Sequence, residues 1–322
     1  METELLRVKN LRTYFYTDIG VAKALDGIDL TVNRGTTLGI VGESGCGKSV
    51  TALSIMRLIP QPPGKIVSGE ILFDGKDLLS LSKKEMRRIR GNRISMIFQE
   101  PMTSLNPVMR IGEQISEVIV LHQRLSRKDA FKKSIEILNL VKIPSPEKRV
   151  HEYPHMISGG MRQRIMIAMA LSCHPNLMIA DEPTTALDVT IQAQILHLMQ
   201  NLKDEFGTSI ILITHDQAVI AENAQEVIVM YGGKIMEYAE VIDLFDNPRH
   251  PYTVGLMKAI PTSNENGKRL NTIRGIVPSL YHLREGCKFN DRCDQVHKRC
   301  FAEEPPLFEL RPKHLCRCWL YE

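Results

Sequence analysis

The segment GESGCGKS, residues Gly42–Ser49, constrains the fold more than any other feature, because it fits the pattern G-x-x-x-x-G-K-S. Before it stands TTLGIVG, a short apolar run typical of a buried strand. After it comes KSVTALSIMRLI, apolar at helical spacing and ended by Pro60. A strand, a glycine-rich turn and a helix in this order present backbone N–H groups and a helix N-terminus to an anion. The segment therefore predicts a phosphate-binding loop on an α/β fold, rather than an ordinary glycine-rich turn.

The residues of this loop have distinct expected roles in holding a nucleotide. Lys48 is expected to reach the β- and γ-phosphates, and Ser49 to bind magnesium. The thiol of Cys46 is expected to act only as a small side chain. The predicted nucleotide-binding residues of the loop are Gly42, Ser44, Gly45, Cys46, Gly47, Lys48, Ser49 and Val50.

A second apolar strand, in LMIADE, ends in two carboxylates, Asp181 and Glu182. Ligands of open α/β sheets bind at the carboxyl ends of the strands. Asp181 suits a magnesium ligand there. Glu182 suits the group that orients and deprotonates an attacking water, because phosphoryl transfer needs positioning and charge neutralisation more than covalent chemistry. Together with the phosphate loop, these residues predict hydrolysis of a nucleotide.

The segment ISGGMRQR contains another helix start suited to an anion. Ser158, Gly159 and Gly160 directly precede a predicted helix, so that backbone N–H groups and the helix dipole meet there. One nucleotide needs only one such helix start. We therefore expect the second to contact a nucleotide that another chain holds, rather than to be a plain capped helix.

The pattern of the whole chain indicates two parts of different texture. Apolar strands that alternate with helices imply a parallel sheet with both faces covered. Residues 1–34 predict strands of a half-buried sheet, and helical patterns over about residues 107–165 predict an inserted subdomain. We expect one domain over residues 1–260 and, after the polar segment PTSNENGKRLN, a small cysteine-rich appendage over residues 261–322.

Composition and charge exclude several classes of protein. The 322 residues, 43% of them hydrophobic, are enough for one large domain and a smaller part. The net charge of +4 makes no electrostatic case for a nucleic-acid partner. The start METELLRVKN lacks the apolar region of a secretory signal, and no run approaches the ~20 apolar residues of a membrane span. These features predict a cytosolic protein.

With these motifs the chain resembles the ATPase subunits of ABC transporters over residues 1 to about 260. The resemblance implies ATP and Mg²⁺ as cofactors and a P-loop ABC-type nucleotide-binding domain, with a parallel-sheet core, an antiparallel β subdomain and an inserted helical subdomain. It implies that Gln99, in FQEPMTSLNP, contacts magnesium and senses a membrane partner. His215, in LITHD, is expected to hold the γ-phosphate, and Asp188, in ALD, to communicate across a dimer.

The resemblance also implies an aromatic residue early in the chain that stacks on adenine. Counting back from AKAL favours Phe15, with Tyr14 and Tyr16 beside it. The chain departs from the family in the segment ISGGMRQR, where Met161 replaces the usual glutamine and Gln163 lies two residues on. This departure concerns a side-chain contact to the ribose region, not the backbone contacts of the glycines before it.

The motifs GESGCGKS, FQEPMTSLNP, SGGMRQR and HPYTVGL, with the cysteines of the tail, are together similar to those of the ATPase subunits of dipeptide and oligopeptide importers, a type shared with nickel importers. This resemblance implies a subunit that hydrolyses ATP to power peptide uptake at the cytoplasmic face of the cell membrane. ATP would lie between two ATPase subunits, the partner being a related chain or a second copy. The further partners would be two transmembrane permease subunits and, indirectly, an extracellular substrate-binding protein, with no nucleic acid.

Most of the cysteines lie in the C-terminal tail. In a cytosolic chain, clustered thiols bind metal more often than they form disulfides. Four thiolates suit zinc or an iron–sulfur cluster, and the spacing leaves both open, as well as unligated thiols. The importer resemblance implies a [4Fe–4S] cluster whose last ligand precedes a tryptophan, as Cys318 precedes Trp319, with zinc as the alternative and Cys316 as a spare. The expected ligands are Cys287, Cys293, Cys300 and Cys318.

Two other functions stay open on the motifs. A soluble ABC-type ATPase acting on DNA or ribosomes would carry the same loop, but such proteins usually have two ATPase halves or long coiled-coil insertions. A small-molecule kinase would use the phosphate loop, yet it leaves Ser158–Gly160 and His215 unexplained. The cargo also stays open, because partner proteins recognise it.

Overall fold

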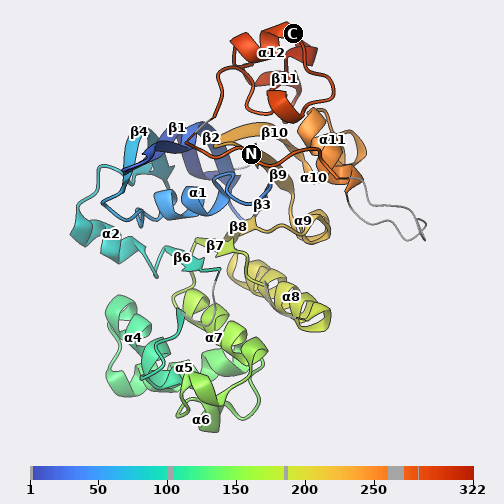
Figure 1. Cartoon of the computed structure of the whole chain (residues 1–322). Helices are drawn as coiled ribbons and strands as arrows, with labels where there is room; N and C mark the ends of the chain where they lie inside the picture. Colours follow the sequence, from blue (N-terminus) through green and yellow to red (C-terminus); the bar gives the residue numbers. More distant parts are fainter. Residues whose placement is uncertain (1–2, 100–103, 185–187, 260–271, 282) are drawn as a thin grey trace. The chain divides into compact units, whose positions relative to one another are not determined.

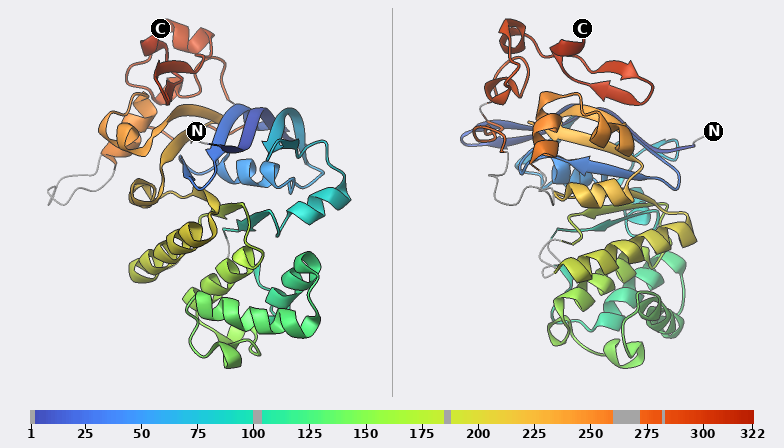
Figure 2. Two further views of the ribbon diagram at one scale, coloured as in Figure 1. Left: turned by 180° about the vertical axis from the view of Figure 1, so that it is seen from behind. Right: turned by 90° about the vertical axis from the view of Figure 1, so that its right-hand side faces the viewer.

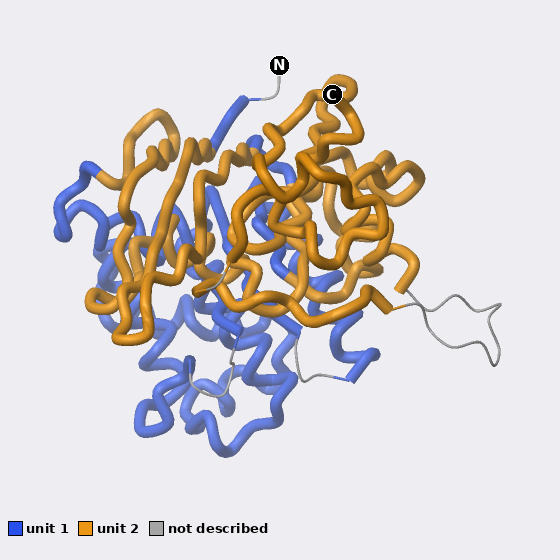
Figure 3. The backbone as a smooth tube through the Cα atoms, turned by 45° about the horizontal axis from the view of Figure 1, so that its top comes forward, with its two compact units in different colours: residues 1–5, 33–36, 80–213 blue, residues 6–32, 37–79, 214–322 orange. Residues whose placement is uncertain are grey.

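The structure is a computed structural model that describes residues 3–99, 104–184, 188–259, 272–281 and 283–322 (Figure 1; two further views in Figure 2). The chain divides into two compact units, which Figure 3 shows in different colours. The first unit comprises residues 1–5, 33–36 and 80–213, and the second comprises residues 6–32, 37–79 and 214–322. The phosphate loop belongs to the second unit, whereas the strand that ends in Asp181 belongs to the first.

The N-terminal strands of the second unit form a four-stranded sheet in the order β2-β1-β4-β5. The pairs β1–β4 and β4–β5 are antiparallel, as expected for the antiparallel β subdomain that the family resemblance implies. The strands β1 and β2 each have 14 residues and alternate irregularly between buried and exposed positions, as a sheet with one face on the core does. The bounds are β1 Glu4–Thr17, β2 Gly20–Asn33, β4 Gly64–Phe73 and β5 Lys76–Asp77.

The strand that leads into the phosphate loop belongs to a second, mixed set of strands. β3 (Thr37–Val41) is buried at every position and runs parallel to β9 (Glu226–Tyr231), which is also buried throughout. From β9 the order continues through β10, β12 and β11, and each of these pairs is antiparallel. The remaining bounds are β10 Lys234–Glu240, β12 His314–Cys316, β11 Phe308–Arg311, α1 Lys48–Ile55, α9 Gln217–Asn223, α10 Val241–Asp246 and α11 Pro251–Lys258.

The C-terminal residues continue this sheet. β12 pairs with β10, where Cys316 stands opposite Glu237 and Leu315 opposite Tyr238. The other C-terminal elements are short, namely η2 (Asn290–Arg292), α12 (Lys298–Ala302) and η3 (Trp319–Tyr321). Residues 214–322 fall in one compact unit. The predicted boundary at residues 260/261 and the polar segment after it lie outside the described residues.

A buried network of charged side chains joins β12 to β10 and α10. The imidazole of His314 lies 2.8 Å from a Glu237 oxygen through Nε2 and 2.6 Å from an Asp243 oxygen through Nδ1. Arg311 is also paired with Asp243, at 3.1 Å. The hydrogen bond to Glu237 is the main cause that raises the pKa of His314, which burial opposes and Asp243 reinforces. A raised folded-state pKa means that this imidazole stabilises the junction fully below its ordinary pKa, and that the contribution is lost as pH rises through the raised value.

The first unit contains three parallel strands, in the order β8-β7-β6. Between β6 and β7 the chain forms a group of mutually packed helices, green in Figure 1, where the sequence predicts a helical subdomain. α8 is closed by Gly207, the residue after its last, whose φ of 64° is the left-handed conformation that glycine favours at helix ends. The bounds are β6 Ile94–Ile97, β7 Leu177–Asp181, β8 Ser209–Ile213, α2 Lys83–Ile89, α4 Ile111–Gln123, α5 Arg127–Leu140, α6 Pro146–Arg149, η1 Pro154–Met156, α7 Gly159–Leu171 and α8 Val189–Phe206.

None of the helices in the described part of the chain is both long enough and apolar enough to cross a membrane. α8, with 18 residues, buries Ile195, Leu198, Met199 and Leu202 at helical spacing, together with Leu196 and Lys203, and its exposed positions are polar except for Val189 and Ala193. This is the pattern of a helix that covers a sheet.

Candidate active site

The backbone of the phosphate loop is possible only with glycine at two positions. Gly42, directly after β3, has a φ of 148°, and a Cβ there would lie 2.3 Å from the carbonyl oxygen of Met230. Gly47, directly before α1, has a φ of 111°, and its Cβ would lie 2.6 Å from the carbonyl oxygen of Ala24. Neighbouring strands therefore press on the loop at both ends, and side chains at these positions would displace it.

The side chain of Lys48 is folded back on the loop. Its Nζ donates to the carbonyl oxygen of Gly42 at 2.7 Å and to that of Glu43 at 3.1 Å, and the residue is only 5% exposed. Ser44 and Gly45 form the exposed tip of the loop, whereas Cys46 is fully buried. Burial raises the pKa of the Cys46 thiol, which agrees with its expected role as a small, unreactive side chain.

Glu43 anchors the loop through Tyr252 and Arg292, which the sequence does not predict as site residues. Its backbone N–H donates to the hydroxyl of Tyr252 at 2.8 Å. Its carboxylate makes a two-point ion pair with Arg292, at 2.6 and 3.0 Å. Tyr252 lies in the motif HPYTVGL, which could have pointed to it; Arg292 carries no motif signal beyond its place next to Cys293.

In the first unit, the carboxylates of Asp181 and Glu182 at the end of β7 are buried. Glu182 contacts Gln99, another residue that the sequence predicts for the site. Asp181 is 3% exposed and Glu182 is 6% exposed. The side-chain amide of Gln99 donates to a carboxylate oxygen of Glu182 at 2.9 Å. Glu182 has a φ of 48°, which is uncommon outside glycine and is found at functional sites where the surrounding structure enforces it. The structure thus brings Gln99 and Glu182 together.

The segment Ser158–Gly160 forms the start of α7 as predicted. The Ser158 hydroxyl accepts the N–H of Met161 at 3.4 Å, and a Cβ placed on Gly159 would meet no atom of the described residues within 4 Å. Gly160 lies against Ile191, 3.0 Å from where its Cβ would be, and Asp188 caps α8 by accepting the N–H of Ile191 at 2.9 Å. The helix start and Asp188 are therefore neighbours, and none of the described residues packs against Gly159.

Gln163 does not take the place of the glutamine that Met161 replaces. It is fully buried, and its side-chain amide donates to the carbonyl oxygen of Pro183. A side chain engaged in the interior presents nothing to a ligand at the surface. The departure from the family pattern at Met161 therefore stands uncompensated by Gln163.

Two further predicted residues lie in the second unit. His215 is exposed and follows the last residue of β8 by two positions. Phe15 is half-buried on β1 and packs against Gly64 of β4, its register partner. Of the neighbouring rings, Tyr14 donates to Asp26 at 2.7 Å, whereas Tyr16 is 49% exposed. Phe15 stays a prediction as the ring that stacks on adenine.

The tail cysteines lie in one part of the second unit. Cys287 donates its backbone N–H to the carbonyl of Cys300 at 2.8 Å, and both are 8% exposed, as is Cys318. Burial raises the pKa of Cys287 to about 12, and the nearby thiols of Cys300, Cys318 and Cys293 add to the rise. Cys316 is fully buried on β12. Across the described residues, no group of three or more histidine, cysteine or acidic side chains is arranged to hold a metal ion.

Comparison with known proteins joins both parts of the chain to known families. The ABC transporter family matches residues 25–185, and the C-terminal region of oligopeptide/dipeptide transporters matches residues 236–300. A probable peptide ABC transporter ATP-binding protein of Sinorhizobium fredii is 55% identical over 98% of this chain and 94% of that protein. The oligopeptide transport ATP-binding protein AppD of Bacillus subtilis is 51% identical over 99% of this chain and 97% of that protein.

A solved structure shows the same fold. A dimeric ATP-binding cassette in a post-hydrolysis state, bound to ADP and Pi, matches with a TM-score of 0.66 and 26% identity, over 74% of this chain and 99% of that chain. This chain is thus an ABC-type ATPase with an α/β cassette fold of mixed sheets. With identity above one half along its length, it belongs to the family of ATP-binding proteins of oligopeptide and dipeptide ABC transporters.

Proposed function

We propose that this chain hydrolyses ATP to power the uptake of di- or oligopeptides through partner membrane subunits. The observation that carries the proposal is the 55% and 51% identity with peptide transporter ATP-binding proteins along nearly the whole chain. That similarity extends beyond the cassette into residues 236–300, the part characteristic of oligopeptide and dipeptide transporters.

The residues of the phosphate loop bind and orient the nucleotide. Lys48 exchanges its two loop carbonyls for oxygens of the β- and γ-phosphates. Ser49 and Asp181 hold Mg²⁺, a hard cation that prefers oxygen ligands and neutralises phosphate charge. The surroundings fit this ion, because Asp181 supplies a carboxylate at the end of a buried strand.

The carboxylate of Glu182 accepts the proton of the attacking water. Gln99 donates to this carboxylate and so positions it, in addition to its proposed contact with the metal. His215 holds the γ-phosphate as negative charge develops on it. Ser158, Gly159 and Gly160 complete the site of a partner subunit, which is supported by their place at the start of α7 with no described residue packed against Gly159.

The proposed assembly contains two ATPase subunits and two permease subunits, at the cytoplasmic face of the cell membrane. The dimeric state of the matched cassette, solved with ADP and Pi, supports a nucleotide held between two cassettes. The partner is a related ATPase chain or a second copy of this one. A substrate-binding protein outside the membrane delivers the peptide to the permeases and acts on this chain only through them.

Peptide uptake by the assembled complex tests the function. We expect proteoliposomes that contain this chain and its permease subunits to take up peptide only when ATP is enclosed on the side of this chain. Complexes that lack the chain serve as the control. ATP hydrolysis that depends on DNA or ribosomes and not on permeases would instead assign the chain to the soluble ABC-type ATPases.

We also propose that Cys287, Cys293, Cys300 and Cys318 hold a [4Fe–4S] cluster, with zinc as the alternative. Cys287, Cys300 and Cys318 are buried, and a backbone hydrogen bond joins Cys287 to Cys300. Cys316 is engaged in β12 and is the spare. The cluster would supply a cross-link between segments of the tail.

Metal and sulfide analysis of protein purified without oxygen tests this proposal. We expect about four irons per chain and a broad absorption band near ~400 nm. Cys318→Ser should abolish the band, whereas the matched variant Cys316→Ser should keep it. One zinc and no colour would replace the cluster by a single ion, and absence of any metal would contradict both assignments.

A further inference from the structure

Glu43, the second residue of the phosphate loop, makes hydrogen bonds through its backbone N–H, its backbone carbonyl and its carboxylate. Its N–H donates to the hydroxyl of Tyr252, its carbonyl accepts from Nζ of Lys48, and its carboxylate binds Arg292. The carboxylate stands 28% exposed, whereas the Arg292 side chain is only 5% exposed. The loop residue is therefore fixed by a cation that reaches it from the interior of the C-terminal part.

Each of the three nitrogens of the Arg292 guanidinium donates to an oxygen. Besides the two bonds to Glu43, Nε donates to the carbonyl oxygen of Arg274 at 2.7 Å and one terminal nitrogen donates to the Tyr231 hydroxyl at 3.3 Å. A planar guanidinium that binds a carboxylate at two points fixes direction as well as distance. These bonds define where the carboxylate of Glu43, and with it the start of the loop, can lie.

An aromatic cluster packs beside the contact between Arg292 and Glu43. The rings of Tyr231, Tyr252 and Phe289 lie 4.8 to 5.3 Å apart between centroids, and all three are almost fully buried. Tyr231 ends β9, Tyr252 belongs to α11, and Phe289 comes from the cysteine-rich tail. Phe289 and Arg292 are three residues apart in the tail, and both contact Tyr231. Arg292 also binds Glu43 of the loop.

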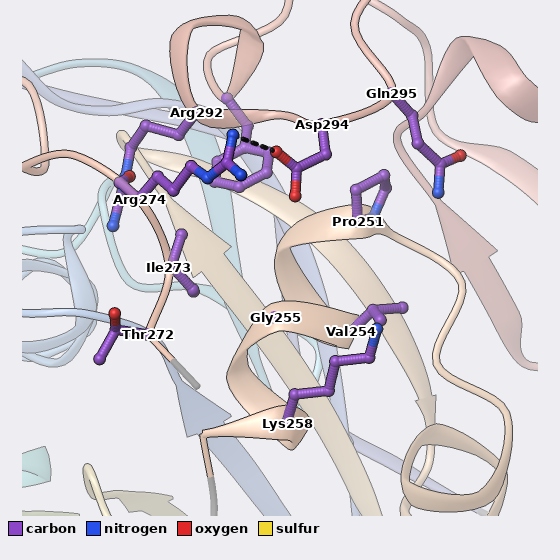
Figure 4. Close-up of a pocket in the computed structure, with 11 residues that line it drawn as sticks. Pro251, Val254, Gly255, Lys258, Thr272, Ile273, Arg274, Arg292, Asp294 and Gln295 are labelled. Carbon is purple, nitrogen blue, oxygen red and sulfur yellow. Dashed lines mark hydrogen bonds and ion pairs between the residues drawn. The ribbon is translucent and has the colours of Figure 1, made fainter. Parts of the chain in front are cut away.

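Arg292 lies between the aromatic cluster and a cavity. One side of it lines a cavity of about 290 Å³, to which α11 and the tail contribute (Figure 4). Arg274 and Asp294, at the edge of this cavity, form an exposed ion pair at 3.5 Å. The polar bonds of Arg292 and its contacts with the rings of Tyr231 and Phe289, whose centroids lie 5.7 and 5.9 Å from the guanidinium carbon, together determine its place.

The turn that carries Arg292 is tied to the tail cysteines. The N–H of Asn290 donates to the carbonyl oxygen of Cys287 at 3.1 Å, and the Asn290 side chain donates to that of Cys300 at 3.3 Å. Arg292 directly precedes Cys293. The short turn η2 therefore connects Arg292 to the backbone of Cys287 and Cys300 through Asn290.

We propose that Arg292 is a positioning residue of the phosphate loop, through which the cysteine-rich tail sets the affinity of the chain for nucleotide. The inference rests on the proposed function, since it requires that this loop binds ATP. Arg292 does not touch the nucleotide. It holds Glu43, and Glu43 holds the loop segment whose carbonyls compete with phosphate for Lys48.

Nucleotide affinity of the purified full chain, measured with a non-hydrolysable ATP analogue and magnesium, tests the proposal. The variants are Arg292→Gln, Glu43→Gln and the double variant. We expect each single variant to bind about tenfold more weakly, in the range usual for coupling between sites. The double variant should bind more tightly than either single one, because it removes both charges and leaves no buried charge without a partner. Arg299→Gln is the control, because Arg299 pairs with Glu303 and stacks on Trp319 away from the loop.

A second measurement separates positioning from general damage to the tail. In the assembled complex, Glu43→Gln should raise KM for ATP and leave kcat near the parent's value, since neither Glu43 nor Arg292 contacts the reacting atoms. Glu43→Gln changes no residue of the tail, so it carries the test even where Arg292→Gln fails to fold. Single variants that bind the analogue as tightly as the parent would overturn the inference, as would equal loss in Arg299→Gln. A parent chain that binds no analogue would instead overturn the proposed function.

Discussion

Replacing Glu182 with glutamine is expected to lower ATP hydrolysis by the assembled complex about a thousandfold, within the range of general-base contributions. Glutamine has the shape of glutamate, and its carbonyl oxygen can still accept the bond that Gln99 donates at 2.9 Å. The substitution therefore removes the basic carboxylate and keeps the contact. ATP should stay bound and hold the two ATPase subunits together, which size-exclusion chromatography with ATP would show as a stable dimer.

The matched control for this variant is Glu205→Gln, on the exposed side of α8 in the same compact unit. It loses the same charge from the protein and should hydrolyse ATP at the parent's rate. If Glu182→Gln also turned over at the parent's rate in the complex, the general base would have to be another group. The buried position of Glu182 and its φ of 48° would then need a structural explanation alone.

Replacing Lys48 with alanine is expected to weaken ATP binding about a hundredfold, because two charged hydrogen bonds to phosphate, at about 1.5 kcal/mol each, are lost. The same change removes the bonds from Nζ to the carbonyl oxygens of Gly42 and Glu43. Alanine is the best helix former, so α1, which begins at this position, should persist. Titration with an ATP analogue would measure the affinity, and circular dichroism would report the helix content.

Lys65→Ala, an exposed lysine on β4 in the same unit, is the control for a change in net charge. It should bind ATP as the parent does. Undiminished affinity in Lys48→Ala would mean that backbone N–H groups of the loop suffice for the phosphates. Weakened binding in both variants would point to long-range charge rather than to a contact.

The local elements of the site were predictable from sequence because each depends on short-range chemistry. The strand, glycine turn and helix around Gly42–Ser49 follow from apolar run, glycine spacing and helical periodicity, and the structure has them at β3 and α1. The buried strand that ends in Asp181 and the helix start at Ser158 were predictable for the same reason. Alternating buried strands and helices predicted the α/β class with a parallel sheet, whereas the sheet that contains β3 and β9 is mixed, since β10, β12 and β11 join it antiparallel.

Side-chain environments were not predictable in this way, because they depend on what packs against each residue. The three aromatics at residues 14–16 are equivalent in sequence, yet Tyr14 is bonded to Asp26, Phe15 packs on Gly64 and Tyr16 is exposed. Gln163 could have been a surface contact by its position near the helix start. The helix rotates it into the interior, where it bonds to the carbonyl of Pro183.

The phosphate loop, the carboxylates Asp181 and Glu182 at the end of β7, and the family to which the chain belongs can all be read from the residues alone, since the chemistry of phosphate requires those residue types at that spacing. The support of the loop, in contrast, depends on contacts that form only in the folded chain. Glu43 and Arg292 are 249 residues apart, and no local pattern relates them. They meet because β9 runs parallel to β3, and because the tail returns over the end of β9 with Phe289 and Arg292 directed at Tyr231. A contact of that kind arises from the packing of distant segments, which is a property of the folded chain and not of any short stretch within it.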